Sequence, residues 1–348
     1  YRICAPRRAC HRADGFGRDP SARPRNEVFA FALAGCRDSN NSFIRPQAMD
    51  PIFTTGDAAA AIPIWFVTAA NYPQVRERLE PGARVFADAA TFEPKPGRHL
   101  LLPGANGLGG VLFGLEAAKD SNDRFLPGLL PQHLPDGAYR FANDPHDARL
   151  AALAFALGAY RFTRYRETEQ RKLRLDLPQS IDREDLDRVV EAVTLARDLI
   201  NTPANDMGPA ELEAAARTLA ARHGAKMSVI IGDNLLSENF PLIHAVGRAS
   251  KRAPRLIELR WGDEAAPRVS IVGKGVCFDS GGLDIKSESA MLLMKKDMGG
   301  AASALALAHM IMDRGLKVQL TVFLPAVENA ISGDAFRPWQ HSNHRLGS

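Results

Sequence analysis

Apolar and polar positions along the second half of the chain follow two alternating patterns. Short apolar runs rich in β-branched residues predict strands, at residues 227–231, 255–261, 268–273 and 318–324. Apolar residues at helical spacing predict helices, at residues 184–200, 209–223 and 301–313. Strands that alternate with helices predict an α/β fold, in which helices cover both faces of a largely parallel or mixed sheet.

The first half of the chain predicts a smaller α/β unit. Residues 62–68 and 98–102 are strand candidates, and residues 147–160 have the spacing of a helix. Pro63 favours an edge position for the first strand, because proline cannot donate a ladder hydrogen bond. The glycine-rich stretch 104–114 lacks the Gly-x-Gly-x-x-Gly spacing of a dinucleotide site, so it predicts a turn before a strand.

These patterns divide the chain into segments. Residues 1–48 are rich in arginine, proline and polar side chains without a sustained apolar period, and we expect a disordered upstream extension before a start at Met49. Residues 49–171 form the predicted N-terminal α/β domain. A strand and linker at 172–183 mark the boundary to the second α/β domain, residues 172–338.

Composition and charge narrow the function. The 348 residues are 45% hydrophobic and 24% charged, which is typical of a soluble globular protein of two domains. The net charge is +4, but residues 1–48 hold nine Lys and Arg against four Asp and Glu, and the remainder holds 35 against 36. The predicted domains are therefore nearly neutral, which argues against nucleic-acid binding.

Hydropathy and the positions of the cysteines indicate the cellular compartment of the protein. No run approaches the ~20 apolar residues of a membrane-spanning helix, so we expect no membrane association. Three of the four cysteines lie within residues 1–48. Cys277 is then the lone cysteine of the predicted domains, which argues for a reducing compartment, the cytoplasm. We expect Cys277 to be a small buried apolar residue rather than a thiol beside a metal.

The residues that could carry chemistry concentrate between positions 268 and 302. The predicted strand 268–273 runs into Gly-Lys-Gly, followed by Asp-Ser-Gly-Gly and later by an aspartate shortly before a Gly-Gly pair. Two lysines and two carboxylates thus lie near strand ends and glycine turns, where α/β enzymes usually keep their catalytic groups. They are Lys274, Asp279, Lys286 and Asp297.

Two common loop motifs do not fit this stretch. A phosphate-binding loop needs a glycine five positions before its Gly-Lys pair and Ser or Thr after it, where this chain has Arg268 and Gly275. A serine nucleophile elbow needs Gly-x-Ser-x-Gly, but Ser280 has Gly282 after it and Phe278 before it. We therefore expect Ser280 to be a turn hydroxyl.

A metal site and a structural ion network remain equal alternatives on the residues alone. Asp279 and Asp297 offer hard oxygen ligands that suit Mg, Mn or Zn. A lysine can join them only as a neutral amine, which requires a lowered pKa. In the alternative, the lysines simply pair with the aspartates. The nine histidines form no His-Glu-x-x-His pair, and we expect His309 to be a packed or surface residue rather than a ligand.

Longer stretches add a family resemblance. VGKGVCFDSGGLDIK at 272–286 and MLLMKKDMGGAA at 291–302 closely resemble the signature of the leucyl aminopeptidase family, the cytosol aminopeptidases or M17 metallopeptidases. RDLINTPANDMGP at 197–209 and LPAVENAISGDAFRP at 324–338 match this family too, and the resemblance extends over residues 49–338.

The resemblance implies a metal-dependent aminopeptidase that releases N-terminal residues from peptides by means of a water activated by two divalent ions, Mn or Zn. It implies that Lys274, Asp279 and Asp297 bind metal, with Asp279 bridging both ions, and that Lys286 is catalytic and polarises the peptide carbonyl. It also implies a cytoplasmic homohexamer. Asn329 would either line the substrate pocket or hold a loop.

One departure from the family changes the expected activity. The family supplies further ligands and an arginine from an Asn-Thr-Asp-Ala-Glu-Gly-Arg segment, which these 348 residues lack, and residues 339–348 resemble nothing in the family. We therefore expect a catalytic domain that is incomplete at its C-terminus, an impaired second metal site and little hydrolysis by this chain. The alternative is a non-catalytic family member that assembles or binds DNA or another partner.

Overall fold

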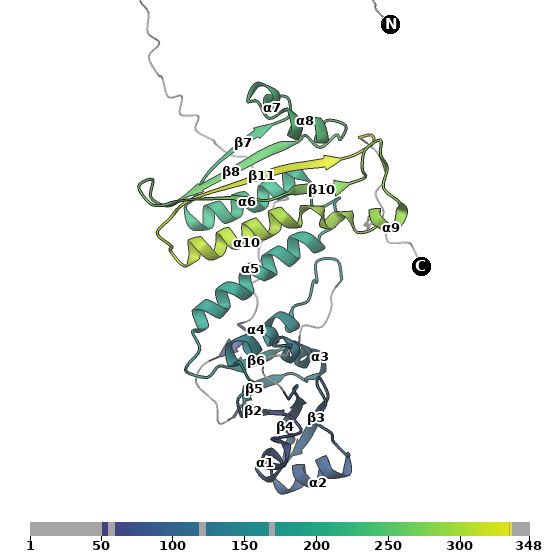
Figure 1. Cartoon of the computed structure of the whole chain (residues 1–348), viewed down its shortest axis with the longest axis vertical. Helices are drawn as coiled ribbons and strands as arrows, with labels where there is room; N and C mark the ends of the chain where they lie inside the picture. Colours follow the sequence, from purple (N-terminus) through teal and green to yellow (C-terminus); the bar gives the residue numbers. More distant parts are fainter. Residues whose placement is uncertain (1–50, 55–59, 118–122, 167–170, 334, 336–348) are drawn as a thin grey trace, which may run out of the picture. The chain divides into compact units, whose positions relative to one another are not determined.

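The computed structural model describes residues 51–54, 60–117, 123–166, 171–333 and 335 (Figure 1). The predictions for residues 1–48 and 339–348 lie outside the described residues. The described part of the chain contains two β-sheets, each packed against helices, and none of its helices is long and apolar enough to cross a membrane.

The first sheet is mixed. Its strands are β1 (Phe53–Thr54), β2 (Ile62–Val67), β3 (His99–Gly104), β4 (Gly107–Gly114), β5 (Gly137–Phe141) and β6 (Leu173–Asp176). Across the sheet the order is β1-β6-β5-β2-β4-β3, and the pairs are parallel except for the β3–β4 hairpin. The glycine-rich stretch supplies the turn of that hairpin, which confirms the predicted turn before a strand.

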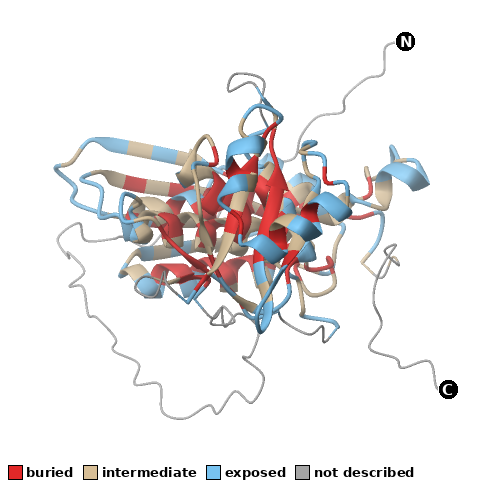
Figure 2. Ribbon diagram, turned by 90° about the horizontal axis from the view of Figure 1, so that it is seen from below, coloured by how far each residue is buried: buried red, intermediate tan, exposed pale blue. Residues whose placement is uncertain are grey.

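Helices cover both faces of the first sheet, because successive side chains of a strand point to opposite sides. Ile64 of β2 enters one core together with Phe155, whereas Val67 enters a second core together with Ala83. Figure 2 shows the buried residues gathered where helices meet the sheets. The helices of this part are α1 (Tyr72–Glu77), α2 (Pro81–Ala89), η2 (Leu126–Leu129), α3 (Leu130–His133) and α4 (Ala148–Ala159).

The predicted edge position of β2 is wrong, because β2 lies inside the sheet between β5 and β4. The carbonyl of Ile64 accepts a hydrogen bond from Ala142, just after β5, so the nitrogen of the neighbouring Pro63 faces the β4 side. Pairing with β4 begins only at Ile64. The missing N–H of Pro63 therefore leaves no ladder hydrogen bond unmade.

The pairing of β6 differs from the predicted domain division. The strand after Lys172 is expected in the second domain, but β6 pairs with β5 and β1 in the first sheet. Leu175 of β6 lies opposite Tyr139 of β5, and both side chains are fully buried. We therefore propose that the boundary follows β6, before α5 (Arg183–Asn201) begins with Asp182 as its N-cap.

The second sheet carries the residues of candidate chemistry. Its strands are β7 (Lys226–Ile231), β8 (Arg255–Trp261), β9 (Arg268–Val272), β10 (Gly275–Asp279) and β11 (Gln319–Asn329). β9 and β10 follow one another along the same side of the long β11 in parallel register, and β8 and β7 continue the sheet in antiparallel pairs. This mixed sheet confirms the predicted fold class.

Helices pack on this sheet as its sequence pattern predicts. The long helices α6 (Pro209–His223) and α10 (Gly299–Asp313) share a core with the strands. The short helices α7 (Asn234–Ser237) and α8 (Pro241–Gly247) lie on the other side of the sheet (Figure 1). α6 has the predicted limits because Pro209 opens its first turn and Gly224, at φ +65°, ends it in the left-handed conformation.

β11 is longer than the predicted strand 318–324 and continues through Pro325 to Asn329. The carbonyl of Phe323 accepts a hydrogen bond from Gly273, so the nitrogen of Pro325, two residues on, faces the same side. That side is open at Pro325, because pairing with β9 ends at Phe323 and pairing with β10 begins one residue after the proline. Asn329 consequently ends a strand, rather than lying in a loop after it.

Candidate metal centre

Lys274 lies in the break between β9 and β10, against the first turn of α10. Its carbonyl accepts a hydrogen bond from the Ala301 N–H at 2.8 Å. A side chain on Gly273 would meet the backbone of Gly300 and Ala301 at 2.7 Å, and one on Gly300 would meet the Lys274 nitrogen at 2.8 Å. Glycine at both positions permits this close approach, which determines where the lysine side chain leaves the backbone.

Asp297 lies in η3 (Met294–Met298), just before α10, and faces Lys274. Lys274 Nζ donates a hydrogen bond to Asp297 Oδ1 at 2.8 Å, with side chains 60% and 20% exposed. The other oxygen, Oδ2, is buried and has no hydrogen-bond partner in the described part of the chain. A buried carboxylate oxygen without a donor is costly, so this atom has unused capacity to bind a cation.

Asp279 ends β10 and is held by three donors. Its Oδ1 accepts hydrogen bonds from the Gly281 N–H at 3.0 Å and from Asn329 Nδ2 at 2.8 Å, and Lys286 Nζ lies 3.1 Å from Oδ2. Burial raises the pKa of this carboxyl group, but the donated hydrogen bonds and the lysine charge outweigh burial and lower the pKa overall. Asp279 is therefore ionised at neutral pH, as a metal ligand must be.

The turn after Asp279 depends on its glycines and on Ser280. Gly281 has φ +86°, and a side chain there would meet the carbonyl oxygen of Asp284 at 2.1 Å. Ser280 Oγ donates to the Asn329 carbonyl at 2.8 Å and accepts from the Gly282 N–H at 3.2 Å. Ser280 is thus a turn hydroxyl, as predicted, and the turn returns the chain so that the Lys286 N–H reaches the Ser280 carbonyl at 3.0 Å.

The structure joins the four predicted residues as two pairs, Lys274 with Asp297 and Lys286 with Asp279. β10 packs against η3, which brings the segments of both pairs next to each other. Among the described residues, no hydrogen bond or ion pair connects one pair to the other. The pairing itself is what the ion-network alternative predicts, and the unpaired Asp297 Oδ2 is the feature that a network of salt bridges does not use.

Asn329 is a site residue whose contact the sequence interpretation missed. It lies opposite Asp279 in the β10–β11 register, and its Nδ2 donates to the Asp279 carboxylate. The signal was the length of β11, which the interpretation ended at Leu324. A strand that continues through Pro325 would have placed Asn329 beside Asp279 at the end of the sheet.

Cys277 behaves as the sequence predicts. Its side chain is 1% exposed and packs in the core beneath β10. Burial raises the pKa of its thiol. Cys277 is therefore a small buried apolar residue and not a thiolate beside the candidate centre.

Comparison with known proteins decides the family. The model of the cytosol aminopeptidase family catalytic domain matches residues 194–343, and that of the M17 aminopeptidase N-terminal domain matches residues 62–178. The chain belongs to the cytosol aminopeptidase family. The N-terminal range contains β2 to β6, and the catalytic range begins within α5 and contains the whole second sheet.

The alignments of this chain with its relatives cover only part of each relative. Probable cytosol aminopeptidases of Corynebacterium glutamicum and Corynebacterium efficiens are each 37% identical, over 204 and 253 residues, which are 56% and 68% of this chain. These alignments cover 41% and 50% of the relatives. The chain therefore spans about half the length of the curated relatives that it matches.

Solved structures share the fold. The cytosol aminopeptidase from Coxiella burnetii has a TM-score of 0.75 at 42% identity, covering 82% of this chain and 63% of that one. The bottromycin maturation enzyme BotP, solved in complex with Mn, has a TM-score of 0.66 at 29% identity, covering 80% and 62%.

Proposed function

We propose that this chain carries part of a metal-dependent aminopeptidase centre, in which Lys274, Asp279 and Asp297 bind divalent metal and Lys286 acts on the substrate carbonyl. The observation that carries the proposal is the buried Oδ2 of Asp297, which lacks a partner in the described residues although Lys274 occupies the neighbouring oxygen. Family membership supports the same assignment, and a related enzyme was solved with Mn.

The donor set fits a divalent ion. Two carboxylates provide hard oxygen ligands, and the amine of Lys274 adds a nitrogen ligand once it loses its proton. In the described structure Lys274 is exposed enough to exchange that proton with solvent. A bound divalent ion would supply Lewis acidity and a water of lowered pKa. The family resemblance implies Mn or Zn, and we propose one of these two metals as the bound ion.

The chain's own residues divide the remaining tasks. Gly281 and Asn329 hold Oδ1 of Asp279, which keeps the carboxylate plane in one orientation and suits it to a bridging role between two ions. Lys286, once it leaves Asp279, can donate a hydrogen bond to the oxyanion that develops on a peptide carbonyl. Lys274, Asp279 and Asp297 would give one ion three ligands, and of these residues only Asp279 would also bind a second ion.

Peptide substrates follow from the family, and we propose peptides with a free amino terminus as the substrate class. On the basis of the family resemblance, we also propose that the protein is a homohexamer and that it is located in the cytoplasm. Sedimentation velocity of the purified chain tests the hexamer directly, because a monomer of 37.9 kDa and a hexamer differ sixfold in mass.

The test of the centre is a Mn²⁺ titration of the 348-residue chain, followed by electron paramagnetic resonance, with hydrolysis of a leucyl chromogenic amide measured in parallel. We expect Asp279→Asn and Asp297→Asn to abolish tight Mn²⁺ binding and any hydrolysis. Asp284→Asn is the matched control, because Asp284 is an exposed carboxylate of the same loop. Equal Mn²⁺ affinity of Asp279→Asn and Asp284→Asn would overturn the assignment.

A further inference from the structure

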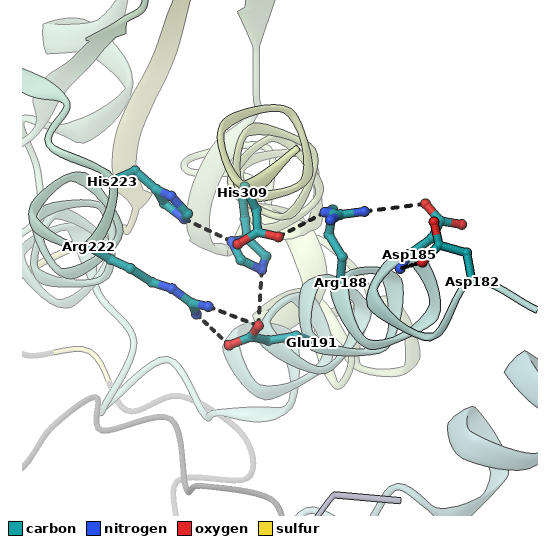
Figure 3. Close-up of polar contacts among 8 residues, drawn as sticks. Asp182, Asp185, Arg188, Glu191, Arg222, His223 and His309 are labelled. Carbon is teal, nitrogen blue, oxygen red and sulfur yellow. Dashed lines mark hydrogen bonds and ion pairs between the residues drawn. The ribbon is translucent and has the colours of Figure 1, made fainter. Parts of the chain in front are cut away.

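A second group of potential metal ligands lies where the ends of α6 and α10 meet, beside α5. His309 of α10 is 1% exposed, and His223 is the last residue of α6. The two rings point toward each other, with His223 Nε2 3.0 Å from His309 Nδ1 (Figure 3). Asp313 follows His309 by four residues on α10 and so lies on the same helix face.

The three side chains have the spacing of a metal-binding set. One ligand atom from each of His223, His309 and Asp313 lies within 4.8 Å of the other two. With Zn–N bonds of about 2.0–2.1 Å, two imidazole nitrogens of a tetrahedral site lie roughly 3.3 Å apart. The two rings therefore need to separate by only a few tenths of an ångström to hold an ion between them. Two imidazoles and one carboxylate are a ligand set that divalent transition metals use.

Two of the three ligands, His309 and Asp313, are also oriented by a neighbour on the far side. Glu191 Oε2 of α5 lies 3.3 Å from His309 Nε2, an ion-pair distance at which the N–H is not aligned as a full hydrogen bond. Arg222 pairs with both oxygens of Glu191. A carboxylate behind one ring nitrogen is the usual support of a metal-binding histidine, because it favours the proton on that nitrogen and leaves the other, here Nδ1, free to bind.

Arg188 orients Asp313, as Glu191 orients His309. Its Nε donates to Asp313 Oδ2 at 2.8 Å, and the Arg188 side chain is 7% exposed. The described contact uses one carboxylate oxygen and leaves Oδ1 for an ion. The arginine charges do not oppose a cation strongly, because Arg188 also pairs with Asp185 and Arg222 with Glu191.

We propose that His223, His309 and Asp313 bind one divalent transition-metal ion, with zinc the best match, as a structural clamp between α6 and α10. This site is separate from the Lys274–Asp297 centre. Residues 301 to 309 of α10 rise by about 12 Å along the helix, so the two sites lie toward opposite ends of it. His309 is buried, as expected of a packed residue, and its proposed role as a ligand goes beyond the sequence expectation because its partner His223 is 86 positions away in the chain.

The test uses the full chain with Asp279→Asn and Asp297→Asn, which removes the first centre. Zn²⁺ binding is measured by competition with a chromophoric chelator, and Co²⁺ binding by the visible absorption of the bound ion. We expect one Zn²⁺ per chain, and we expect His223→Gln to weaken it at least 100-fold. His223 is half-buried and lies at a helix end, so this variant should fold; Asp313→Asn, at the more exposed ligand, should weaken binding at least tenfold.

The matched control is His244→Gln on α8, because His244 also contacts a carboxylate, Asp233 at 3.0 Å, but has no second histidine. We expect the control to keep the Zn²⁺ affinity of the parent and its Co²⁺ spectrum. A parent that binds no Zn²⁺, or equal affinities of His223→Gln and His244→Gln, would overturn the proposal. Neither result bears on the Mn²⁺ titration of the first centre, so the two proposals fail independently.

Discussion

At the scale of single residues, the two lysines of the candidate centre have opposite expected roles although both pair with an aspartate. Lys274 pairs with Asp297 and is proposed to become a metal ligand, whereas Lys286 lies against Asp279 Oδ2 and would compete with an ion for that atom. The ion-network alternative gives both lysines the same role. Removing each lysine separately therefore distinguishes the two hypotheses.

We predict that Lys274→Met lowers the Mn²⁺ affinity of the chain at least tenfold, and that Lys286→Met leaves it unchanged or raises it. The reason is that the first variant removes a donor atom and the second frees a carboxylate oxygen. Isothermal titration calorimetry with Mn²⁺ measures both. A similar loss of affinity in both variants would favour the ion network.

Asn329 should act on the metal through Asp279. We predict that Asn329→Ala lowers Mn²⁺ affinity by about 10–100-fold, because residues that orient a ligand typically have effects of this size. The control is Asn234→Ala, at an exposed helix-start position remote in sequence from the centre. Thermal unfolding of the metal-free proteins checks that both variants are folded. Affinity unchanged by Asn329→Ala would mean that the contact with Asp279 is incidental.

At the scale of elements, the turn between Asp279 and Lys286 depends on a backbone conformation that only glycine adopts readily. Gly281 combines φ +86° with a backbone carbonyl oxygen 2.1 Å from where a Cβ would stand. Gly315, after α10, also has positive φ, but a Cβ there meets nothing within 4 Å. Comparing substitutions at these two glycines separates the cost of the left-handed conformation, which both pay, from the cost of the clash, which arises only at Gly281.

We predict that Gly315→Ala costs about 1 kcal/mol of unfolding free energy, because a left-handed residue with a Cβ costs roughly 1–2 kcal/mol. Gly281→Ala should cost more than about 2 kcal/mol and also weaken Mn²⁺ binding, since the turn must shift and take the Gly281 N–H away from Asp279. Urea unfolding and Mn²⁺ titration measure the two effects. Equal costs at both glycines would show that the turn absorbs the added methyl group.

The limits of helices and strands were predictable where local residues such as proline and glycine end the element. They were not predictable where pairing with a neighbouring strand sets the limit. α6 and β8 have the limits that the sequence predicts, because proline, glycine and apolar spacing mark them. Pro63 suggested an edge strand, and the predicted strand 318–324 ended before Pro325, yet each proline places its nitrogen, which carries no hydrogen, where no neighbouring strand pairs. Gaps in a ladder are properties of the partner strands, so no local pattern shows them.

The same distinction holds for the sites. Lys274, Asp279, Lys286 and Asp297 lie within one stretch of sequence, so a motif could single them out. Their pairing as lysine–aspartate couples was one of the two alternatives left open. Asn329 and the His223–His309 contact depend on register and helix packing between distant segments, which the sequence pattern does not encode locally.

At the scale of the whole molecule, stability at high pH should depend on the buried Tyr139. Its hydroxyl donates to the Pro135 carbonyl at 2.7 Å, and burial, together with Asp136, raises the pKa of Tyr139 to about 12, from 10.0. The fold therefore favours the neutral phenol. Its contribution is fully present below pH 10 and is lost as the pH rises toward about 12.

We predict that the unfolding free energy of the parent exceeds that of Tyr139→Phe at pH 9, because the variant loses a hydrogen bond in the core. The difference should shrink between pH 10 and about 12, since only the parent has a phenol to ionise at this position. Urea unfolding at a series of pH values measures the difference. A gap that stays constant through this range would contradict the raised pKa.

The central claim is that the Lys274, Asp279 and Asp297 side chains share a metal ion. A crystal structure of the chain grown with Mn²⁺, with anomalous diffraction data, locates such an ion directly. We predict an anomalous peak bonded to Asp297 Oδ2, Asp279 and the Lys274 amine, with the Lys274–Asp297 ion pair replaced by ligation. An intact 2.8 Å ion pair and no anomalous peak at saturating Mn²⁺ would contradict the claim and leave a structural ion network in its place.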